Sequence, residues 1–239
     1  MFKQRFIILV LLISTGLISF PISAMIDWNL DMLGFSPNSK FFVLVESMTE
    51  GNTGIARAKI NVIDVGINGC VQDGCLTASG SEENLKTEDK VLNELYGKTK
   101  GLRQRLGLTQ KQLGGYQAEG PFFQGNKGNN CSGNAYYLYD NLKFSVRLQQ
   151  KSTTGVYVPY TKTSMQLDVT LEDYNVTVVL DSLDNYREFI DKYQLGYMFV
   201  SPNKTNIAIL IYAYHRGVDG EDIRTQVETT TFFLPLNSS

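Results

Sequence analysis

The chain is 239 residues long and weakly acidic, with a formal net charge of −2 from 22 basic and 24 acidic side chains. This length suits one domain or two small ones and can bury a full hydrophobic core without metal or disulfide staples. The charge balance argues against a protein that binds nucleic acid or anionic lipid.

Residues 1–24 have the pattern of a cleaved export signal. Lys3 and Arg5 precede an apolar run of about 15 residues, and Ala24 supplies a small residue at the expected cut. A bilayer-spanning helix needs about 20 residues, so an uncleaved anchor is the weaker alternative. We predict cleavage near Ala24, a periplasmic or secreted protein, and no stable membrane insertion after cleavage. Residues 25–239 are then expected to form a single β-rich domain.

Two predicted strands lead to a pair of cysteines. Residues 41–45 are a short apolar run of strand formers, and residues 58–65 place apolar side chains on both faces. Cys70 and Cys75 follow, with the turn dipeptide Asp73-Gly74 between them. Closely spaced thiols on either side of a turn can close a small loop.

The third cysteine, Cys131, leaves the pairing of the thiols open. One disulfide is expected in an oxidising compartment, and we predict Cys70–Cys75 with Cys131 free. Buried thiols without a disulfide are the alternative. A zinc site is disfavoured because the chain has one histidine and no second cysteine pair. We predict neither a metal nor a cofactor.

A helix is predicted after the cysteine pair. Ser79 can cap its start, with Glu82 three residues further on, and leucines recur at helical spacing as far as residue 106. Acidic side chains come early and basic ones late, which suits the helix dipole. Gly97 and Gly101 weaken the pattern, so two shorter helices are an alternative.

The middle of the chain predicts a loop followed by a hairpin. Residues 114–134 contain six glycines and four asparagines, which indicates a surface loop, with an aromatic binding loop as the alternative. An aromatic run, Tyr136, Tyr137 and Tyr139, is assigned to strand packing rather than to a ligand platform. Alternating apolar residues then predict three strands, at 144–148, 165–171 and 176–180. A turn at 172–175 joins the last two.

The last third of the chain predicts a second helix and two strands. Tyr186, Phe189, Ile190 and Tyr193 share one helical face between residues 184 and 193, and Gly196 is placed to end that helix. Residues 207–212 are apolar on both faces and suit a central strand, and residues 225–233 alternate. The fold class predicted is mainly β, with antiparallel sheets and two short helices.

One short sequence pattern occurs near both ends of the predicted domain. Phe35-Ser36-Pro37-Asn38 and Val200-Ser201-Pro202-Asn203 each precede a strand, and both have turn chemistry. This pattern resembles the start of a blade in the TolB-type β-propellers. The copies lie 165 residues apart, whereas blades repeat roughly every 40 to 50. We therefore expect blade-like hairpins within another β architecture.

A second resemblance covers most of the expected mature chain. Residues 33–37, 58–65 and 196–224 resemble a bacterial family described only as predicted secreted protein, a domain of unknown function. The resemblance implies export and a β-rich fold. It implies no chemistry, because that family has no established activity.

Ionisable residues gather near the C-terminus. His215, the chain's one histidine, lies at the end of a predicted strand, shortly before Asp219, Glu221 and Asp222. A catalytic histidine needs a nucleophile and an orienting acid, and no Gly-x-Ser-x-Gly or other nucleophile signature is present. We expect an exposed strand-end residue and keep His215, Asp219 and Glu221 as the catalytic candidates. The acidic spacing fits no calcium loop.

Two functional hypotheses follow from these patterns. The first is an exported, non-enzymatic protein that binds a protein or small-molecule partner, still unknown, through β edges or loops. The second is an extracytoplasmic hydrolase that uses His215 with nearby acids. The first is preferred because the sequence contains no catalytic motif.

Overall fold

The computed structural model describes residues 28–51, 53–110, 113–124, 133–156, 161–217 and 220–232. The predicted export signal and Cys131 lie outside these ranges. Within them the protein is mainly β, as predicted, and consists of three antiparallel sheets with one α-helix and one 3-10 turn.

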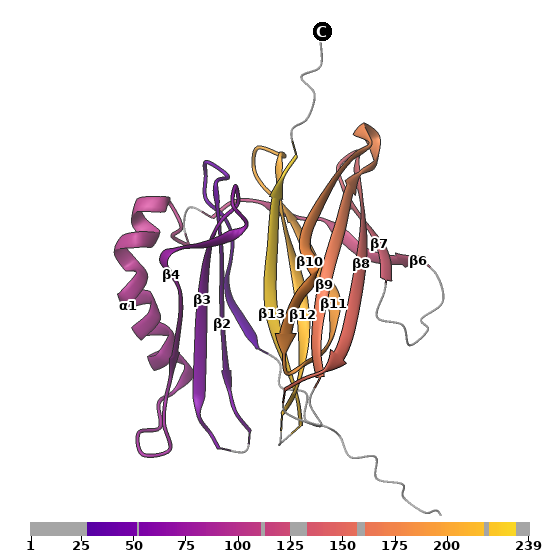
Figure 1. Cartoon of the computed structure of the whole chain (residues 1–239). Helices are drawn as coiled ribbons and strands as arrows, with labels where there is room; N and C mark the ends of the chain where they lie inside the picture. The colour runs from indigo at the N-terminus through magenta and orange to yellow at the C-terminus, as the bar shows by residue number, and fades with distance from the viewer. Residues whose placement is uncertain are drawn as a thin grey trace, which may run out of the picture.

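The helix and the sheets are stacked as layers (Figure 1). Helix α1 (Glu88–Leu106) covers the N-terminal sheet, which contains β1 (Asn29–Phe35), β2 (Phe41–Thr49), β3 (Ala56–Asp64) and β4 (Gly69–Ser79). The central sheet follows, in the order β13 (Gly220–Thr231), β12 (Asn206–Gly217), β11 (Ile190–Val200) and β5 (Tyr116–Gln117). The outer sheet contains β10 (Val176–Glu188), β9 (Thr161–Leu171), β8 (Leu142–Thr154), β7 (Gly133–Tyr139) and β6 (Glu119–Gln124).

The central sheet is buried on both faces, as residues 207–212 predict. Ile207, Ile209 and Ile211 pack against the outer sheet, while Ala208 and Leu210 pack against the N-terminal sheet. Successive side chains of a strand point to opposite faces, so one apolar run serves two cores. A third core lies between the N-terminal sheet and α1.

Helix α1 begins later than the sequence pattern suggests. Thr87, not Ser79, is the N-cap, and its hydroxyl accepts a hydrogen bond from the Lys90 amide. Ser79 ends β4, where pairing with Arg57 satisfies its backbone. Gly97 and Gly101 do not split the helix, because packing of its apolar face on the sheet outweighs their low helix propensity.

The predicted second helix is wrong, because residues 184–193 belong to β10 and β11. Phe189, at a positive φ of 63°, forms the corner between the two strands. Ile190 and Tyr193 are buried in the core between the central and outer sheets. Gly196 lies within β11 and ends no helix. The helical spacing of four apolar side chains was too short a pattern to outweigh pairing with β9 and β12.

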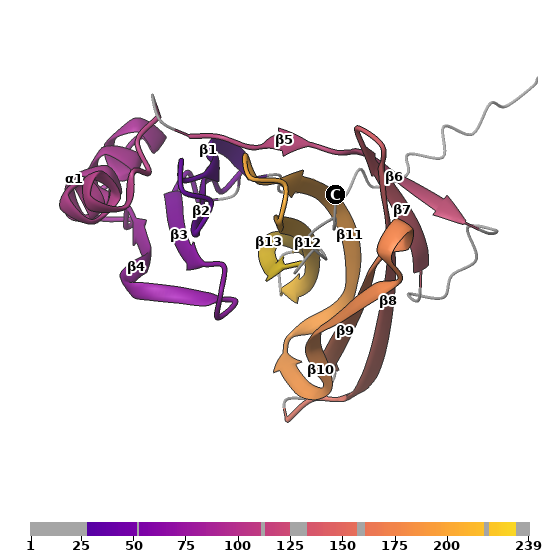
Figure 2. The same cartoon turned by 90° about the horizontal axis from the view of Figure 1, so that it is seen from above.

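The predicted glycine-rich loop is also partly strand. Residues 116–117 and 119–124 form β5 and β6, and residues 125–132 lie outside the described ranges. The segment that carries β5 crosses the edges of the N-terminal and central sheets (Figure 2). It pairs with Phe35 through Gly114 and with Val200 through Tyr116. Edge pairing with two sheets thus orders residues whose composition predicts a loop.

The two Ser-Pro-Asn segments form hairpin turns of the same construction. In the first, the Ser36 hydroxyl donates to Asn38 Oδ1 (2.7 Å) and accepts from the Phe41 amide (3.0 Å). In the second, Ser201 makes the equivalent bonds to Asn203 (2.5 Å) and Asn206 (3.0 Å). The blade-like hairpins expected from the sequence are therefore consistent with the fold.

Candidate functional site: an aromatic cleft between two sheets

A cleft of about 510 Å³ opens where the N-terminal and central sheets separate. Its floor consists of residues paired across β11, β12 and β13. Gln194, Tyr212 and Thr225 form one row, and Tyr214 pairs with Ile223 in the next. The opposite wall comes from the start of the chain's described part, with Trp28, Asn29 and Leu30.

The tyrosine rings of the floor are held by their neighbours in the central sheet. The Tyr214 hydroxyl donates to Gln194 Oε1 at 2.6 Å. Tyr212 lies close to Gly196, where an added Cβ would come within 2.8 Å of the ring. A side chain at residue 196 would therefore displace Tyr212, and the glycine is required for this close approach.

Two lysines place positive charge against the aromatic rings. Lys192 Nζ lies 4.2 Å from the Tyr214 ring centroid, and Lys59 Nζ lies 5.3 Å from that of Trp28. Lys59 is fixed further by an ion pair with buried Glu46 (2.8 Å) and by a hydrogen bond to the Thr225 carbonyl (2.6 Å). A cationic ligand would be repelled by these ammonium groups, so the cleft suits a neutral or anionic one.

The indole of Trp28 carries an unsatisfied donor. Its Nε1 is buried and has no acceptor among the described residues. Buried polar atoms in folded proteins nearly always have a partner, so an unpaired one indicates a place for a ligand or a water oxygen. Trp28 is also the only tryptophan in the chain, which makes its fluorescence specific to this cleft.

His215 does not belong to the cleft. It follows Ile211 and Ala213 on the face of β12 that turns toward the outer sheet, opposite to Tyr212 and Tyr214. It is half-buried rather than exposed as expected, since β12 continues past it in register with β13. Burial, and then repulsion by Arg224, lowers the pKa of His215 to about 4, so the imidazole is neutral at pH 7.

The acidic candidates near His215 are only partly described. Asp219 and the side chain of Glu221 lie outside the described residues. Asp222 is paired across the strands with His215 and forms an ion pair with Arg224 (2.8 Å). In the part of the chain that the structure describes, no three His, Cys, Asp or Glu side chains are grouped as metal ligands would be.

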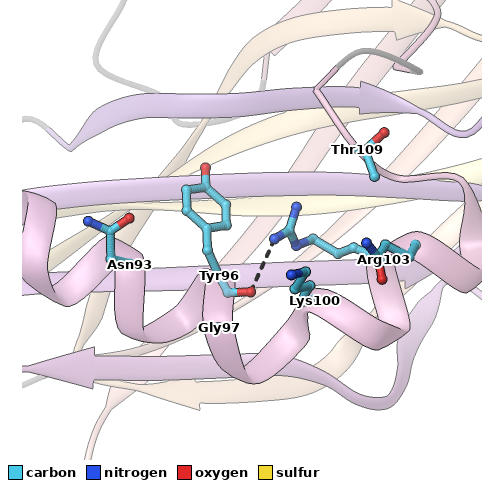
Figure 3. Close-up of a pocket in the computed structure, with 7 residues that line it drawn as sticks. Asn93, Tyr96, Gly97, Lys100, Arg103 and Thr109 are labelled. Atoms are coloured by element: carbon cyan, nitrogen blue, oxygen red, sulfur yellow. Dashed lines mark hydrogen bonds between the residues drawn. The ribbon is translucent and has the colours of Figure 1, made fainter.

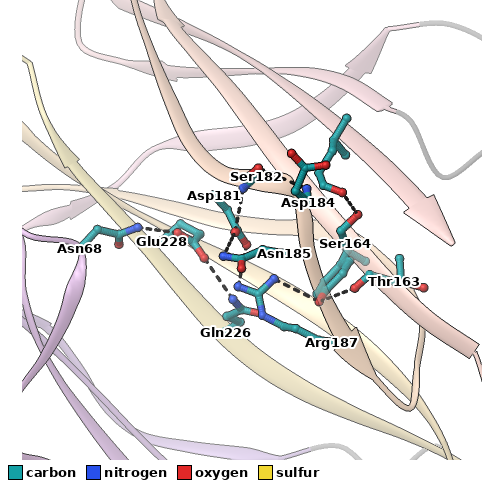
Figure 4. A network of polar contacts seen from close by, with 12 residues as sticks. Asn68, Thr163, Ser164, Asp181, Ser182, Asp184, Asn185, Arg187, Gln226 and Glu228 are labelled. Atoms are coloured by element: carbon teal, nitrogen blue, oxygen red, sulfur yellow. Dashed lines mark hydrogen bonds and ion pairs between the residues drawn. The ribbon is translucent and has the colours of Figure 1, made fainter. Parts of the chain in front are cut away.

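A second polar cluster joins all three sheets (Figure 4). Glu228 of β13 accepts hydrogen bonds from Asn68 Nδ2 (2.6 Å) and Gln226 Nε2 (3.1 Å). Nearby on β10, Arg187 forms an ion pair with Asp181 (2.6 Å). Burial raises the pKa of Glu228, with the Asp181 carboxylate adding to the effect. These residues lie outside the cleft and hold the sheets together.

The cysteine pair and the tyrosine run are found where the sequence places them. The sulfur atoms of Cys70 and Cys75 are 2.04 Å apart, and Asp73 between them has a positive φ of 59°. Tyr137 is fully buried and its hydroxyl donates to the Gly196 carbonyl (2.8 Å). Tyr139 stacks on Tyr116 at 5.3 Å.

The residues of the cleft itself were missed by sequence reasoning. Trp28, Tyr212 and Tyr214 carry no motif, and the cleft forms only because chain segments about 180 residues apart meet. The signal available was the alternation of Tyr212 and Tyr214 at the end of the apolar run of β12, which marks where one face of the strand becomes exposed to water.

Neither a scan against protein-family models nor a search of the curated proteins found a match for this chain. Across the described ranges, no helix combines the length and the apolar character needed to cross a membrane.

Proposed function

We propose that this chain is an exported, non-enzymatic binding protein whose aromatic cleft holds a small, neutral, polar ligand, with a saccharide unit as the best fit. The observation that carries the proposal is the pairing of aromatic faces with amide and hydroxyl groups on one floor. Tyr212 and Tyr214 lie there beside Gln194 and Thr225. Sites for small molecules combine apolar and aromatic walls with a few convergent polar groups in this way.

The chemistry of the lining favours a sugar over other small ligands. An aromatic face packs against the apolar C–H face of a pyranose ring, while amide and hydroxyl groups exchange hydrogen bonds with its hydroxyls. The ammonium groups of Lys59 and Lys192 disfavour a cationic ligand. A volume of about 510 Å³ has room for one or two sugar rings.

Export rests on two observations of different kinds. The pattern of residues 1–24 is that of a cleaved signal, and Cys70 and Cys75 lie at disulfide distance. Membership of the bacterial secreted family, and a relation of the two hairpins to propeller blades, remain part of the proposal. Both agree with a non-catalytic role outside the cytoplasm.

The hydrolase alternative requires a nucleophile beside His215. Among the described residues, His215 makes no hydrogen bond to a serine, threonine or cysteine, and it faces away from the cleft. A panel of esterase, peptidase and glycosidase substrates tests the alternative. Turnover that is lost in a folded His215→Ala variant would replace the binding proposal with the enzymatic one.

Trp28 allows a direct test of ligand binding. Titration of the purified protein with a panel of mono- and disaccharides should give a saturable change in tryptophan emission for at least one sugar. Tyr214→Ala should weaken that affinity about tenfold, because a lost aromatic stacking contact is worth about 1.4 kcal/mol. Tyr197→Ala is the matched control, since Tyr197 is an exposed tyrosine on the neighbouring strand β11 and does not line the cleft. If no sugar alters the emission, or if both variants weaken binding equally, the proposal is wrong.

A further inference from the structure

A second concave site lies on α1, on the other side of the N-terminal sheet from the aromatic cleft. This groove has a volume of about 390 Å³ and follows one face of the helix (Figure 3). It is lined by Asn93, Tyr96, Gly97, Lys100, Arg103 and Gln104, and Thr109 borders it beyond the end of the helix. An added Cβ at Gly97 would meet no atom within 4 Å, so that glycine leaves the middle of the groove open.

Arg103 places a buried guanidinium in this groove. The residue is only 9% exposed, and its guanidinium carbon lies 4.6 Å from the centroid of the Tyr96 ring. Nε donates to Thr99 Oγ1 and Nη2 donates to the Tyr96 carbonyl, both at 3.2 Å. A guanidinium has five N–H donors, so these two bonds leave three for another acceptor.

The charge of Arg103 is not matched by an acid. Across the described ranges, no carboxylate lies within ion-pair distance of it. Burial lowers the pKa of Arg103, and no neighbouring charge offsets that shift. The Tyr96 ring that Arg103 contacts carries a hydroxyl that donates to exposed Asp31. A buried cation without an anion is costly, and a bound anion would remove that cost.

The surrounding helix adds positive charge. Residues 97–106 contain four basic side chains and no acidic one, although the chain as a whole is weakly acidic. Lys100 is exposed and lines the same groove as Arg103, so two cations can contact one ligand. The amides of Asn93 and Gln104 supply further hydrogen-bonding groups along the groove. Compensation of the helix dipole explains basic residues in the last turn, but not a guanidinium enclosed in a groove.

We infer that this groove binds an oxyanion, the phosphate or carboxylate group of a small molecule, held by Arg103 and Lys100. A planar guanidinium matches the two oxygens of such a group, and a flexible lysine adds a second charge. The remainder of the ligand would extend along α1 past Gly97 toward Asn93. The site is separate from the aromatic cleft and does not depend on the saccharide proposal.

Inorganic phosphate and acetate are suitable probes, each titrated against chloride at constant ionic strength and followed by calorimetry and thermal melting. Wild type should show saturable heat and a rise in melting temperature with at least one probe, and the stronger probe identifies the anionic group. Arg103→Gln should abolish this binding. Lys100→Gln, a surface change that leaves the fold intact, should weaken it at least threefold. Arg105→Gln is the matched control, because it removes the same charge from the last turn at an exposed position outside the groove.

Three outcomes would overturn the inference. The first is that neither probe acts beyond the effect of chloride. The second is that Arg103→Gln, if folded, binds as tightly as wild type. The third is that Arg105→Gln weakens binding as much as Lys100→Gln, which would mean that the helix attracts anions without a site. If Arg103→Gln does not fold, the comparison of the lysine variant with the Arg105 control decides the question.

Discussion

The side-chain amide of Asn206 donates a 2.5 Å hydrogen bond to the backbone carbonyl of Ser39, and so joins the two Ser-Pro-Asn turns. A second bond runs between the same turns, from the backbone N–H of Asn203 to Ser39 Oγ (3.3 Å). Ser36, Ser39 and Ser201 have no exposed surface. Turns that look like separate hairpin ends in the sequence thus form one buried contact between the N-terminal and central sheets.

Asn206→Ala should lower the free energy of unfolding by about 1–3 kcal/mol, because it leaves the buried Ser39 carbonyl without its donor. Urea unfolding followed by circular dichroism measures the change. Lys204→Ala in the same turn is the control, since its ion pair with Asp140 is exposed on both sides and should contribute little to stability. Equal losses in the two variants would mean that Asn206 has no special role at this junction.

The β class of the fold could be predicted because its strands alternate or are apolar over at least five residues. The stretches at 41–45 and 207–212 are examples, and both lie in strands of the structure. The region 184–193 could not be assigned, since four apolar residues at helical spacing fit a strand pair as well. Its state is decided by pairing with distant strands, which local propensity does not encode.

The candidate sites could not be predicted for a related reason. Trp28 lies in the wall and Tyr214 in the floor of one cleft, and the two are far apart in the chain. Arg103 looks like an ordinary basic residue at a helix end, and only its burial beside Tyr96 sets it apart. His215 attracted attention because it is the one histidine, yet its surroundings depend on which face of β12 it occupies.

Two glycine substitutions should change stability in opposite directions. Gly101→Ala should stabilise the protein by about 0.5–1 kcal/mol, because Gly101 lies inside α1 and an added Cβ meets no atom within 4 Å. Gly74→Ala should destabilise it, because the added Cβ would lie 2.9 Å from Val62 Cβ and 3.0 Å from the Val71 carbonyl oxygen. Thermal melts of the two variants check the signs. A stabilising Gly74→Ala would mean that the β4 bulge differs from the structure described.

Removal of the cysteine pair should lower the free energy of unfolding by about 2 kcal/mol, because the unfolded chain regains the entropy that closure of the six-residue loop removes. Cys70 pairs with Ile63 and Cys75 with Asn61, so the residues between them bulge out of β4. The double variant Cys70→Ser/Cys75→Ser should therefore unfold at lower urea concentration. Treatment of the wild type with a reductant should reproduce the loss and leave the double variant unaffected. A reductant effect of the same size in the double variant would assign the loss to another thiol.

Glu228 should make the protein less stable as pH rises. Burial raises its pKa above the value of 4.5 expected in the unfolded chain. The folded state therefore holds a proton that the unfolded state has already lost, and stability falls as pH increases from about 4.5 through the folded pKa. Glu228→Gln cannot ionise, so its stability relative to wild type should increase over that range. Urea unfolding between pH 4 and 8 measures this, with exposed Glu83→Gln as the control. Parallel curves for wild type and Glu228→Gln would contradict the prediction.

His215 should lower the stability of the protein as pH falls through the acid range, which is the opposite of the pH dependence expected for Glu228. Burial and Arg224 lower its folded pKa to about 4, whereas the unfolded histidine titrates near 6.5. As pH falls from 6.5 to about 4, the unfolded chain takes up a proton that the folded chain does not, so wild type loses stability. The His215→Ala variant has no imidazole to protonate, so it does not lose stability in this way as pH falls. The variant should be slightly less stable than wild type at pH 7.5, through lost packing worth about 0.5–1 kcal/mol, and should equal or exceed it at pH 4.5.

Because the chain has a single histidine, this prediction can be measured without interference from another imidazole. No other side chain in the sequence has an ordinary pKa near 6.5, so the difference between the two proteins in that range reports on His215 alone. Urea unfolding at half-unit pH steps gives the stability difference, and the Hε1 resonance of the one imidazole in a proton NMR titration gives the folded pKa directly. An NMR midpoint near 6.5 would mean that His215 is fully hydrated. The faces of β12 would then have to be reassigned, and the separation of His215 from the aromatic cleft would no longer hold.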